Sequence, residues 1–487
     1  MKEKVEKLKQ FIVKYDELFF IIIFFTMIIG RALWIETIAE DEIWNFQNIY
    51  KMYNGYKIYV DANVITTPLF HFLGLIIFKI FGANFFIFKL YNVFICLFLY
   101  LGIYKIFKAL LFNKLYSFNF SVIMFLVSNN VINSAANYNE LVITFVIYAV
   151  LIILKKEEYK NYILYESIFI FLIIITKQNV GIFYLIGYIM YVILNRKQCK
   201  NMIKILMLVF ILLCFFVYIL FKLDILYGFI NYCFLGIKEF GQNNFSSDVK
   251  MTLLLIFISL VNGLLILYIN YKRGLVNDNE KNNIKTIACF AYSILLISYP
   301  LFNSAHINIA LILQDLLFIY IMFFILKNIR ILKKYFMYFI AFLMIIFFIK
   351  SIEYTCKYFS IILNDRYKYE DVYFGTLFND NVEDKIANVT KYIENSEKKV
   401  VILSPDAALY MIPLKQNNAE MDLILLGNLG KNGENSIIEK VSNLKNKIIL
   451  MNREKLSYQE SNNLREYVIN NFEKIGEIED LLIFEIK

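Results

Sequence analysis

Long apolar runs separated by short charged connections dominate the first three quarters of the chain. The first run extends from Leu18 to about Glu36, and ten more lie near residues 85–104, 117–134, 142–154, 163–176, 181–194, 205–222, 251–271, 286–301, 308–326 and 335–351. A helix that crosses a bilayer needs about 20 apolar residues, so the shorter runs are expected to extend past these limits. The pattern predicts a polytopic α-helical membrane protein with about eleven transmembrane helices.

The segment from Pro68 to Phe81 decides which way the later helices run. It is only 14 residues long and contains His71 and Lys79, which favours an interfacial or re-entrant element over a span. If it does not cross, the connections on one side of the membrane hold 23 Lys and Arg, and those on the other side hold six lysines. Cytoplasmic loops are enriched in Lys and Arg. We therefore predict a cytosolic N-terminus and an extracytoplasmic C-terminal part.

Beyond Asp365 the pattern changes to that of a soluble α/β domain. β-rich strings alternate with helical patterns at 406–411, 434–445 and 458–473, which is typical of βαβ units; the strings are Val400–Leu403, Leu423–Leu426, Lys447–Met451 and Leu481–Ile486. The glycines from Gly427 to Gly433 fit neither G-x-G-x-x-G nor a Walker loop, so they predict a turn. The expected parts are a cytosolic N-terminus (1–17), a transmembrane domain (18–351) with an external loop (37–84), and an extracytoplasmic α/β domain (352–487).

Composition agrees with this division. The chain is 59% hydrophobic and 18% aromatic, with a mean hydropathy of +0.57, which excludes an ordinary soluble protein. The net charge of +9 arises before Asp365, because the part from Asp365 onward holds 16 Lys and Arg against 21 Asp and Glu. The basic excess therefore reports membrane topology and does not indicate nucleic-acid binding. The six cysteines are scattered and predict neither a disulfide framework nor a zinc site.

The stretch from Ala39 to Lys89 carries the strongest candidate chemistry. An acidic cluster, Glu40-Asp41-Glu42, directly follows the first apolar run and precedes a helix-period segment. Acids at a membrane boundary are often ordinary solvated loop. Here they are followed in order by a set of turn and helix signals, namely Gly55, a Tyr-rich turn with Asp61, Thr67-Pro68-Leu69, and a short apolar helix ending in Phe81-Gly82.

This order resembles the first external loop of the GT-C glycosyltransferases, especially the protein O-mannosyltransferases and bacterial aminoarabinose transferases. In those families an Asp-Glu pair after the first transmembrane helix precedes interfacial helices, a Gly-x-x-x-Tyr-like turn, a Pro-Leu pair, and Phe-Gly before a basic residue. The matching positions are Asp41-Glu42, Gly55, Tyr59, Pro68-Leu69, Phe81-Gly82 and Lys89. Lys89 stands where the family usually has Arg, and an ammonium lacks the planar fork that binds phosphate in a bidentate manner.

The predicted topology brings further polar groups to the outer face. Thr176-Lys177 is similar to a Thr-Lys-Gly motif of the aminoarabinose transferases, with Gln178 in place of Gly. Glu140 corresponds by location to a second acid, more often Asp, in the next external loop of many GT-C proteins. Tyr299-Pro300 with His306 resembles late external Tyr-Pro and His elements of relatives. Apart from the resemblance, Lys177 also fits a snorkelling lysine, and His306 fits an exposed loop histidine.

The resemblance implies a membrane glycosyltransferase that moves a sugar, with inversion, from a polyprenyl-phosphate donor in the bilayer to an extracytoplasmic acceptor. It implies no cofactor, and the absence of a His/Cys cluster from the sequence predicts no metal. Asp41 is the expected base and Glu42 the group that orients the acceptor or a cation. The expected substrate-binding residues are Lys177 and Lys89 for the phosphate, with Glu140, His306, Gln178, Tyr59 and Asp61 as further contacts.

Two other classes of membrane protein stay open at this point. A polysaccharide polymerase or ligase of the cell envelope is expected to carry key arginines in a large late external loop, and the predicted external loops contain no arginine. A lipid or sugar transporter is expected to show Gly/Pro-broken helices in two related halves, whereas this chain has four prolines and no visible repeat. The glycosyltransferase interpretation is therefore favoured.

The charge asymmetry leads to a topology prediction. A reporter fused after Lys350 should behave as extracytoplasmic, and one fused at Lys281 should behave as cytosolic. Protease protection of both fusions in sealed vesicles measures the two locations. A cytosolic C-terminal domain would contradict the topology and the grouping of candidate residues on the outer face.

Overall fold

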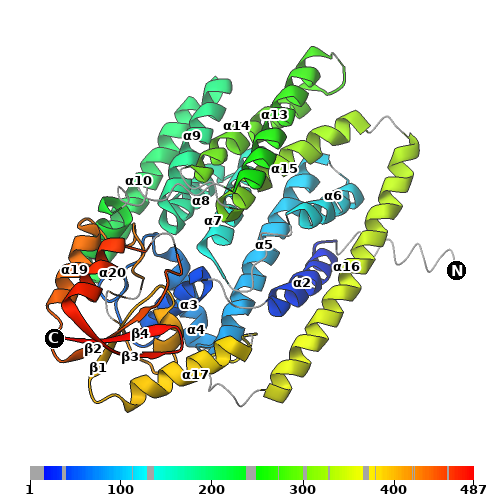
Figure 1. Ribbon diagram of the computed structural model, residues 1–487. Coiled ribbons are helices and arrows are strands. Elements are labelled where there is room, and N and C mark those ends of the chain that lie inside the picture. The colour runs from blue at the N-terminus through cyan, green and yellow to red at the C-terminus, as the bar shows by residue number, and fades with distance from the viewer. Residues whose placement is uncertain are drawn as a thin grey trace.

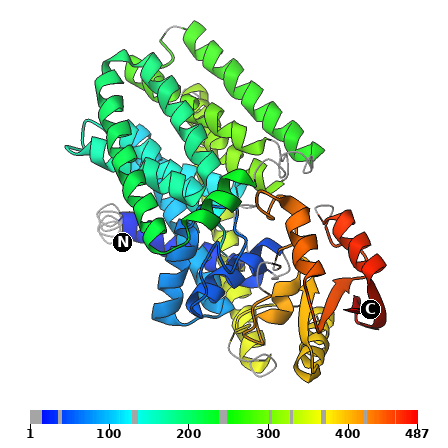
Figure 2. The same ribbon diagram turned by 90° about the vertical axis from the view of Figure 1, so that its left-hand side faces the viewer.

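The structure is a computed structural model of the 487-residue chain. It describes residues 16–35, 40–111, 113–128, 136–236, 248–272, 274–299, 304–326, 330–365, 372–378, 380–418, 421, 423–457 and 460–486. Within these ranges a bundle of helices carries a small α/β domain at one end, and the helices α3 (Glu40–Tyr53) and α4 (Leu69–Phe81) lie between the two parts (Figures 1 and 2). Residues 1–15 and Pro300, which enter the sequence predictions, lie outside the described residues.

Each of the predicted apolar runs coincides with a helix. These helices are α2 (Asp16–Trp34), α5 (Phe85–Leu111), α6 (Lys114–Val127), α7 (Tyr138–Leu154), α8 (Tyr162–Thr176), α9 (Gln178–Leu194), α10 (Cys199–Lys222), α13 (Val249–Tyr271), α14 (Asp278–Ile294), α15 (Ser304–Leu326) and α16 (Arg330–Asp365). Among the described residues, five helices, α2, α5, α10, α13 and α15, are long and apolar enough to cross a membrane. The multi-pass helical architecture is confirmed, whereas the number of spans stays a prediction.

The bundle is held by close packing of apolar faces. α2 packs against both α5 and α16, and Figure 1 shows α16 lying along α2 at the edge of the bundle. A Cβ atom on Gly30 of α2 would lie 2.1 Å from the Ser351 carbonyl oxygen of α16, so only glycine allows this approach. Ser351 Oγ in turn donates to the Met27 carbonyl at 3.1 Å. α16 continues to Asp365 without a break, so the predicted domain boundary at 352 falls inside this helix.

The segment that the sequence predicts to be external, called the external loop below, contains two antiparallel short helices, α3 and α4. Phe46 of α3 lies 5.3 Å from Phe78 of α4 and 4.0 Å from Phe85 of α5 between ring centroids. One turn further along α3, Ile49 lies against Gly74. Aromatic pairs at such distances stabilise a fold by about 0.5–1.5 kcal/mol beyond the effect of the area that they bury. The prediction of a short helix over Pro68–Phe81 is confirmed.

The C-terminal domain contains a four-stranded sheet in the order β1-β2-β4-β3. Its strands are β1 (Lys399–Leu403), β2 (Lys447–Asn452), β3 (Phe472–Ile478) and β4 (Leu481–Ile486), and its helices are α17 (Asp380–Asn395), α18 (Ala407–Met411), α19 (Gly433–Ser442) and α20 (Asn462–Asn471). β1 and β2 are parallel, as the βαβ pattern predicts. β3 and β4 form an antiparallel hairpin whose turn residue Glu479 has a φ of 53°.

Two details of the sequence prediction for this domain are wrong. Leu423–Leu426 is not a strand; within the described residues its Leu425 forms an isolated antiparallel bridge to Glu460. Its backbone instead binds the external loop, because Asn63 Nδ2 donates a hydrogen bond to the Leu423 carbonyl at 2.6 Å. The helical pattern at 458–473 ends at Asn471, and the chain then enters β3.

The glycine-rich turn is a contact to the membrane domain. The short helix α11 (Leu226–Ile230) is followed by η3 (Asn231–Leu235). Asn231 Oδ1 accepts a hydrogen bond from the Lys431 backbone N–H at 3.0 Å. Gly430, with a φ of +74°, lies so close to Asn231 that a Cβ atom would approach its Nδ2 to 2.5 Å. Gly430 therefore allows the backbone of the α/β domain to pack closely against Asn231.

Candidate active site

Lys177 lies at the break between α8 and α9 and is almost fully buried, with 6% of its surface exposed. Its backbone is extended, with φ −154° and ψ 107°. Its Nζ donates to Asn139 Oδ1 at 2.7 Å and lies 3.3 Å from His306 Nε2. The same ammonium lies 5.2 Å from the ring centroid of Tyr138, within cation–π range. The helices α7 and α15 thus meet the junction between α8 and α9 at one ammonium group.

Two carboxylates share this environment. The charge of Lys177 interacts with Asp41, in the first turn of α3, and with Glu140, in the first turn of α7. Asn137 caps α7 by accepting the Asn139 backbone N–H at 2.9 Å, so the first turn of α7 has a defined position. We call Asp41, Asn139, Glu140, Lys177 and His306 the Lys177 cluster. The sequence named four of these five as candidate site residues, and the structure brings those four together.

The surroundings shift the pKa values of Lys177 and Asp41 toward each other. Burial lowers the pKa of Lys177 to about 8, and the negative charges of Asp41 and Glu140 limit that fall. Burial likewise raises the pKa of Asp41, and Lys177 opposes the rise. Asp41 keeps an exposed surface, so an acceptor hydroxyl can reach it. A carboxylate with a raised pKa is a stronger base, which suits proton abstraction.

Lys89 and Glu42 form a second group beside the Lys177 cluster. Lys89 is fully buried, and its Nζ donates to the carbonyls of Leu33 at 3.1 Å and Ile35 at 3.3 Å. These carbonyls belong to the C-terminal end of α2, where a helix has no internal donors left. Glu42, 7% exposed, interacts with the charges of both Lys89 and Glu140. Lys89 therefore fixes the end of α2, and its predicted phosphate contact stays a prediction.

Three other predicted site residues are engaged in holding loops. Tyr59 is buried and its hydroxyl donates to the Thr66 carbonyl at 2.6 Å. Asp61 Oδ2 accepts the Lys57 backbone N–H at 2.7 Å within its own turn. Gln178 Nε2 donates to the carbonyls of Ile65 at 3.0 Å and Cys233 at 3.1 Å. The structure does not bring Tyr59 or Asp61 into the Lys177 cluster. Gln178, the residue after Lys177, hydrogen-bonds to the external loop beside the cluster.

Several residues of this region were not among the sequence candidates. Tyr138 and Asn139 stand directly before Glu140, and their place in the same first turn of a helix was the available signal. Trp44, Asn45 and Asn48 of α3 are buried polar residues one and two turns beyond Asp41. Their helical spacing from Asp41 was the signal that could have found them. In the described part of the chain, no group of three His, Cys, Asp or Glu side chains is placed to hold a metal ion.

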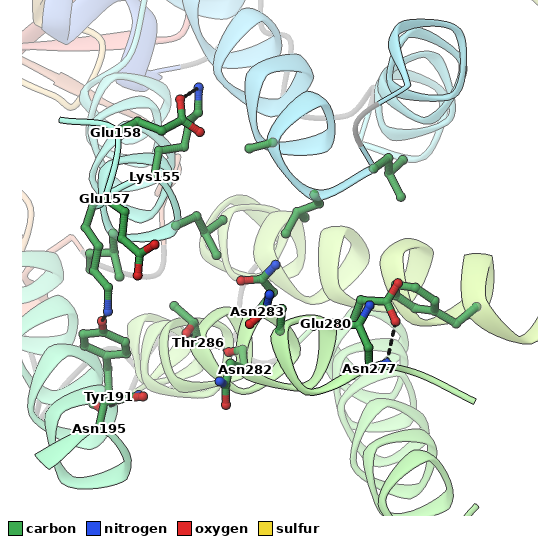
Figure 3. Close-up of a pocket in the computed structure, with 18 of the residues that line it drawn as sticks. Lys155, Glu157, Glu158, Tyr191, Asn195, Asn277, Glu280, Asn282, Asn283 and Thr286 are labelled. Carbon is green, nitrogen blue, oxygen red and sulfur yellow. Dashed lines mark hydrogen bonds and ion pairs between the residues drawn. The ribbon is translucent and has the colours of Figure 1, made fainter. Parts of the chain in front are cut away.

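A separate polar cavity of about 490 Å³ lies at the other end of the bundle (Figure 3). α7 begins at the Lys177 cluster and ends at this cavity, about 25 Å away for its 17 residues. Several of its polar side chains bind one another: Lys155 pairs with Glu158 at 2.6 Å, and Lys156 Nζ donates to the Tyr191 hydroxyl at 2.8 Å. Acids and lysines also meet in this cavity, but its described lining contains no histidine.

The fold is similar to that of known membrane glycosyltransferases. It matches ArnT of Cupriavidus metallidurans bound to undecaprenyl phosphate with a TM-score of 0.58 at 9% identity, covering 96% of each chain. It also matches the oligosaccharyltransferase of Archaeoglobus fulgidus in its apo form with a TM-score of 0.50 at 12% identity, covering 90% of this chain and 70% of that one. No protein-family model and no curated protein matches the sequence.

These matches define the class of architecture. The chain has the fold of the GT-C membrane glycosyltransferases, as the order of residues in its first external loop indicated. At identities of 9% and 12% the likeness concerns the fold. The chemistry of this chain must therefore be argued from its own residues.

The contacts of Lys89 lead to a stability prediction. Lys89→Met removes the donor that the two α2 carbonyls use, so it should destabilise the protein by about 1–3 kcal/mol. Thermal unfolding in detergent measures the loss. Lys79→Met is the matched control, because Lys79 is exposed and should tolerate the change. Equal melting temperatures for the two variants would contradict a structural role for Lys89.

Proposed function

We propose that this protein is a membrane glycosyltransferase that transfers a sugar from a polyprenyl-phosphate donor to an acceptor hydroxyl outside the cytosol. The observation that carries the proposal is the Lys177 cluster, in which a base candidate and a phosphate-binding candidate meet at the ends of α3, α7, α8, α9 and α15. The fold it shares with membrane glycosyltransferases, one of them bound to undecaprenyl phosphate, supports the same class of reaction.

The proposed step is a single inverting displacement. The acceptor hydroxyl gives its proton to the Asp41 carboxylate, and its oxygen forms a bond to the anomeric carbon. The bond from that carbon to the lipid phosphate oxygen breaks, and the electron pair stays on the phosphate. Lys177 stabilises the charge that develops there. Glu42 orients the acceptor, and Glu140 and His306 hold Lys177 in place. The proposed step uses no metal.

An apolar groove offers a binding site for the lipid tail of the donor. The groove, about 680 Å³, runs between α13 and α14 from Leu267 to Leu255. Leu255 packs with Ile307, the residue after His306, so the groove ends beside the Lys177 cluster. Gly263 leaves space along its floor, and exposed leucines line its rim. We propose that the isoprenoid tail of the donor occupies this groove while its phosphate reaches Lys177.

The charge distribution of the connections supports an outward-facing site. With eleven spans and a cytosolic N-terminus, the Lys177 cluster and the α/β domain lie on the extracytoplasmic side. The α/β domain contacts the external loop through Asn63 and contacts η3 through its glycine-rich turn. A domain docked in this way covers the outer face of the bundle, where an acceptor from the cell envelope would approach.

The proposed role of Asp41 leads to a kinetic prediction. The amide of Asp41→Asn keeps the shape of the side chain but cannot accept the proton, so the transfer rate should fall by about two to four orders of magnitude. Glu42→Gln should cost less, because orientation is only part of catalysis. Both rates are measured on purified, folded variants with a sugar-bearing polyprenyl phosphate. A wild-type rate for Asp41→Asn would make Asp41 structural.

The lowered pKa of Lys177 leads to a pH prediction. The value of kcat/KM should rise with pH as Asp41 loses its proton, and it should fall above about pH 8 as Lys177 loses its charge. Lys177→Arg keeps its charge at every accessible pH, so the alkaline fall should disappear while part of the activity remains. Lys177→Ala should raise the KM for the donor or lower kcat. An unchanged alkaline limb in Lys177→Arg would remove Lys177 from the reaction.

A further inference from the structure

Four polar side chains of α3 are buried without a hydrogen-bond partner among the described residues; Gln47 lies away from Asp41 around the helix axis, and the other three lie toward it. These three are Trp44, Asn45 and Asn48, with exposed fractions of 4%, 0% and 1%. The unpartnered atoms are the indole Nε1 of Trp44 and both the Oδ1 and the Nδ2 atoms of the two asparagines. This concentration is unusual, because the large majority of buried polar side-chain atoms in proteins have a partner. We call the three residues the amide face.

The amide face lies on the same side of α3 as Asp41. At 3.6 residues per turn, Asp41, Asn45 and Asn48 fall within about 60° of one another around the helix axis, and Trp44 lies directly beside Asn48. The opposite side of the helix carries Phe46, which packs against α4 and α5. Because Asp41 interacts with Lys177 and Tyr138, this side of α3 faces the Lys177 cluster.

The energetic cost of burial indicates that a ligand supplies the missing hydrogen-bond partners of these groups. A buried donor or acceptor without a partner costs about 1–3 kcal/mol, and the amide face leaves five such atoms. A folded chain tolerates such a cost mainly where function requires it. The amides extend about 10 Å along the helix from Asp41.

We propose that the amide face is the subsite that recognises the transferred sugar, and that this sugar is neutral and rich in hydroxyl groups. The inference rests on the proposed function and names its substrate class. An amide offers two N–H donors and an acceptor oxygen, and a sugar hydroxyl both donates and accepts, so the two match group by group. The indole of Trp44 adds a donor and an apolar surface for the C–H face of the ring. Trp44, Asn45 and Asn48 carry no charge, so they select by hydrogen-bond geometry.

A neighbouring histidine extends the same chemistry. His71 of α4 is fully buried, and neither of its ring nitrogens has a partner among the residues described. Burial lowers the pKa of His71 to about 3, so its ring is neutral and offers one donor and one acceptor. It lies one turn before Gly74, on the side of α4 that contacts α3. Its position places another uncharged polar group beyond the far end of the amide face.

Binding of two kinds of lipid to the full-length protein tests the proposal. The probes are undecaprenyl phosphate without a sugar and undecaprenyl phosphate carrying glucose, galactose, N-acetylglucosamine or the cationic sugar 4-amino-4-deoxyarabinose. Wild-type protein should bind at least one neutral sugar-lipid more tightly than the sugar-free lipid. Asn45→Leu and Asn48→Leu should each weaken that binding by about tenfold, the equivalent of one lost hydrogen bond, and leave the sugar-free lipid unaffected.

Gln47→Leu is the matched control. Gln47 is equally buried and unpartnered but lies roughly 120° from Asp41 around the axis, so its loss should not affect the sugar. If Asn45→Leu or Asn48→Leu fails to bind the sugar-free lipid, the corresponding alanine variant, Asn45→Ala or Asn48→Ala, is measured in its place. Equal weakening of both lipids, unchanged binding in the asparagine variants, or preference for the cationic sugar would each overturn the inference. Wild-type protein that binds the sugar-free lipid but gains nothing from any neutral sugar also overturns it, and failure to bind every probe overturns the proposed function itself.

Discussion

The structure depends on the need to stabilise one ammonium group inside an apolar bundle. Lys177 stands where α8 ends and α9 begins, and burying an unpaired charge at this place would cost several kcal/mol. Its partners come from elsewhere in the chain: Asn139 accepts at 2.7 Å, His306 lies at 3.3 Å, and Asp41 supplies negative charge. Satisfying this single charge therefore fixes the ends of α7, α8, α9 and α15 relative to α3.

The surroundings of the site are arranged to keep these ends in place. Lys89 ties the last carbonyls of α2 to α5, so the helix that precedes Asp41 has a fixed end. Phe46 holds α3 against α4 and α5 from the opposite side. Asn63 then connects the external loop to the α/β domain. A carboxylate on a helix held from several sides can meet an incoming hydroxyl in one geometry, which is what a displacement reaction requires.

Sequence reasoning succeeded where the signal was local and failed where a distant contact decided the outcome. The apolar runs predicted the helices because hydrophobic length is a property of the segment itself. Leu423–Leu426 has a strand-like composition, yet its backbone bonds to Asn63, which lies 360 residues away. Tyr59 matches a family motif in order and Asp61 lies in the same turn, but their contacts hold local turns. The cluster residues Asp41 and Lys177 were found because charges at the ends of apolar helices are rare and need a reason.

The sequence by itself determined a multi-pass helical protein, its α/β appendage, and the small set of charged residues available for chemistry. These follow from hydrophobic length, strand alternation and the high cost of placing charge near lipid, all of which act along a single segment. Only the tertiary structure decided that Lys177 meets Asn139 and His306, that Lys89 serves the end of α2, and that Asn45 and Asn48 are left without partners. Hydrogen bonds are short and directional, so which groups pair is settled only when helices distant in sequence have packed.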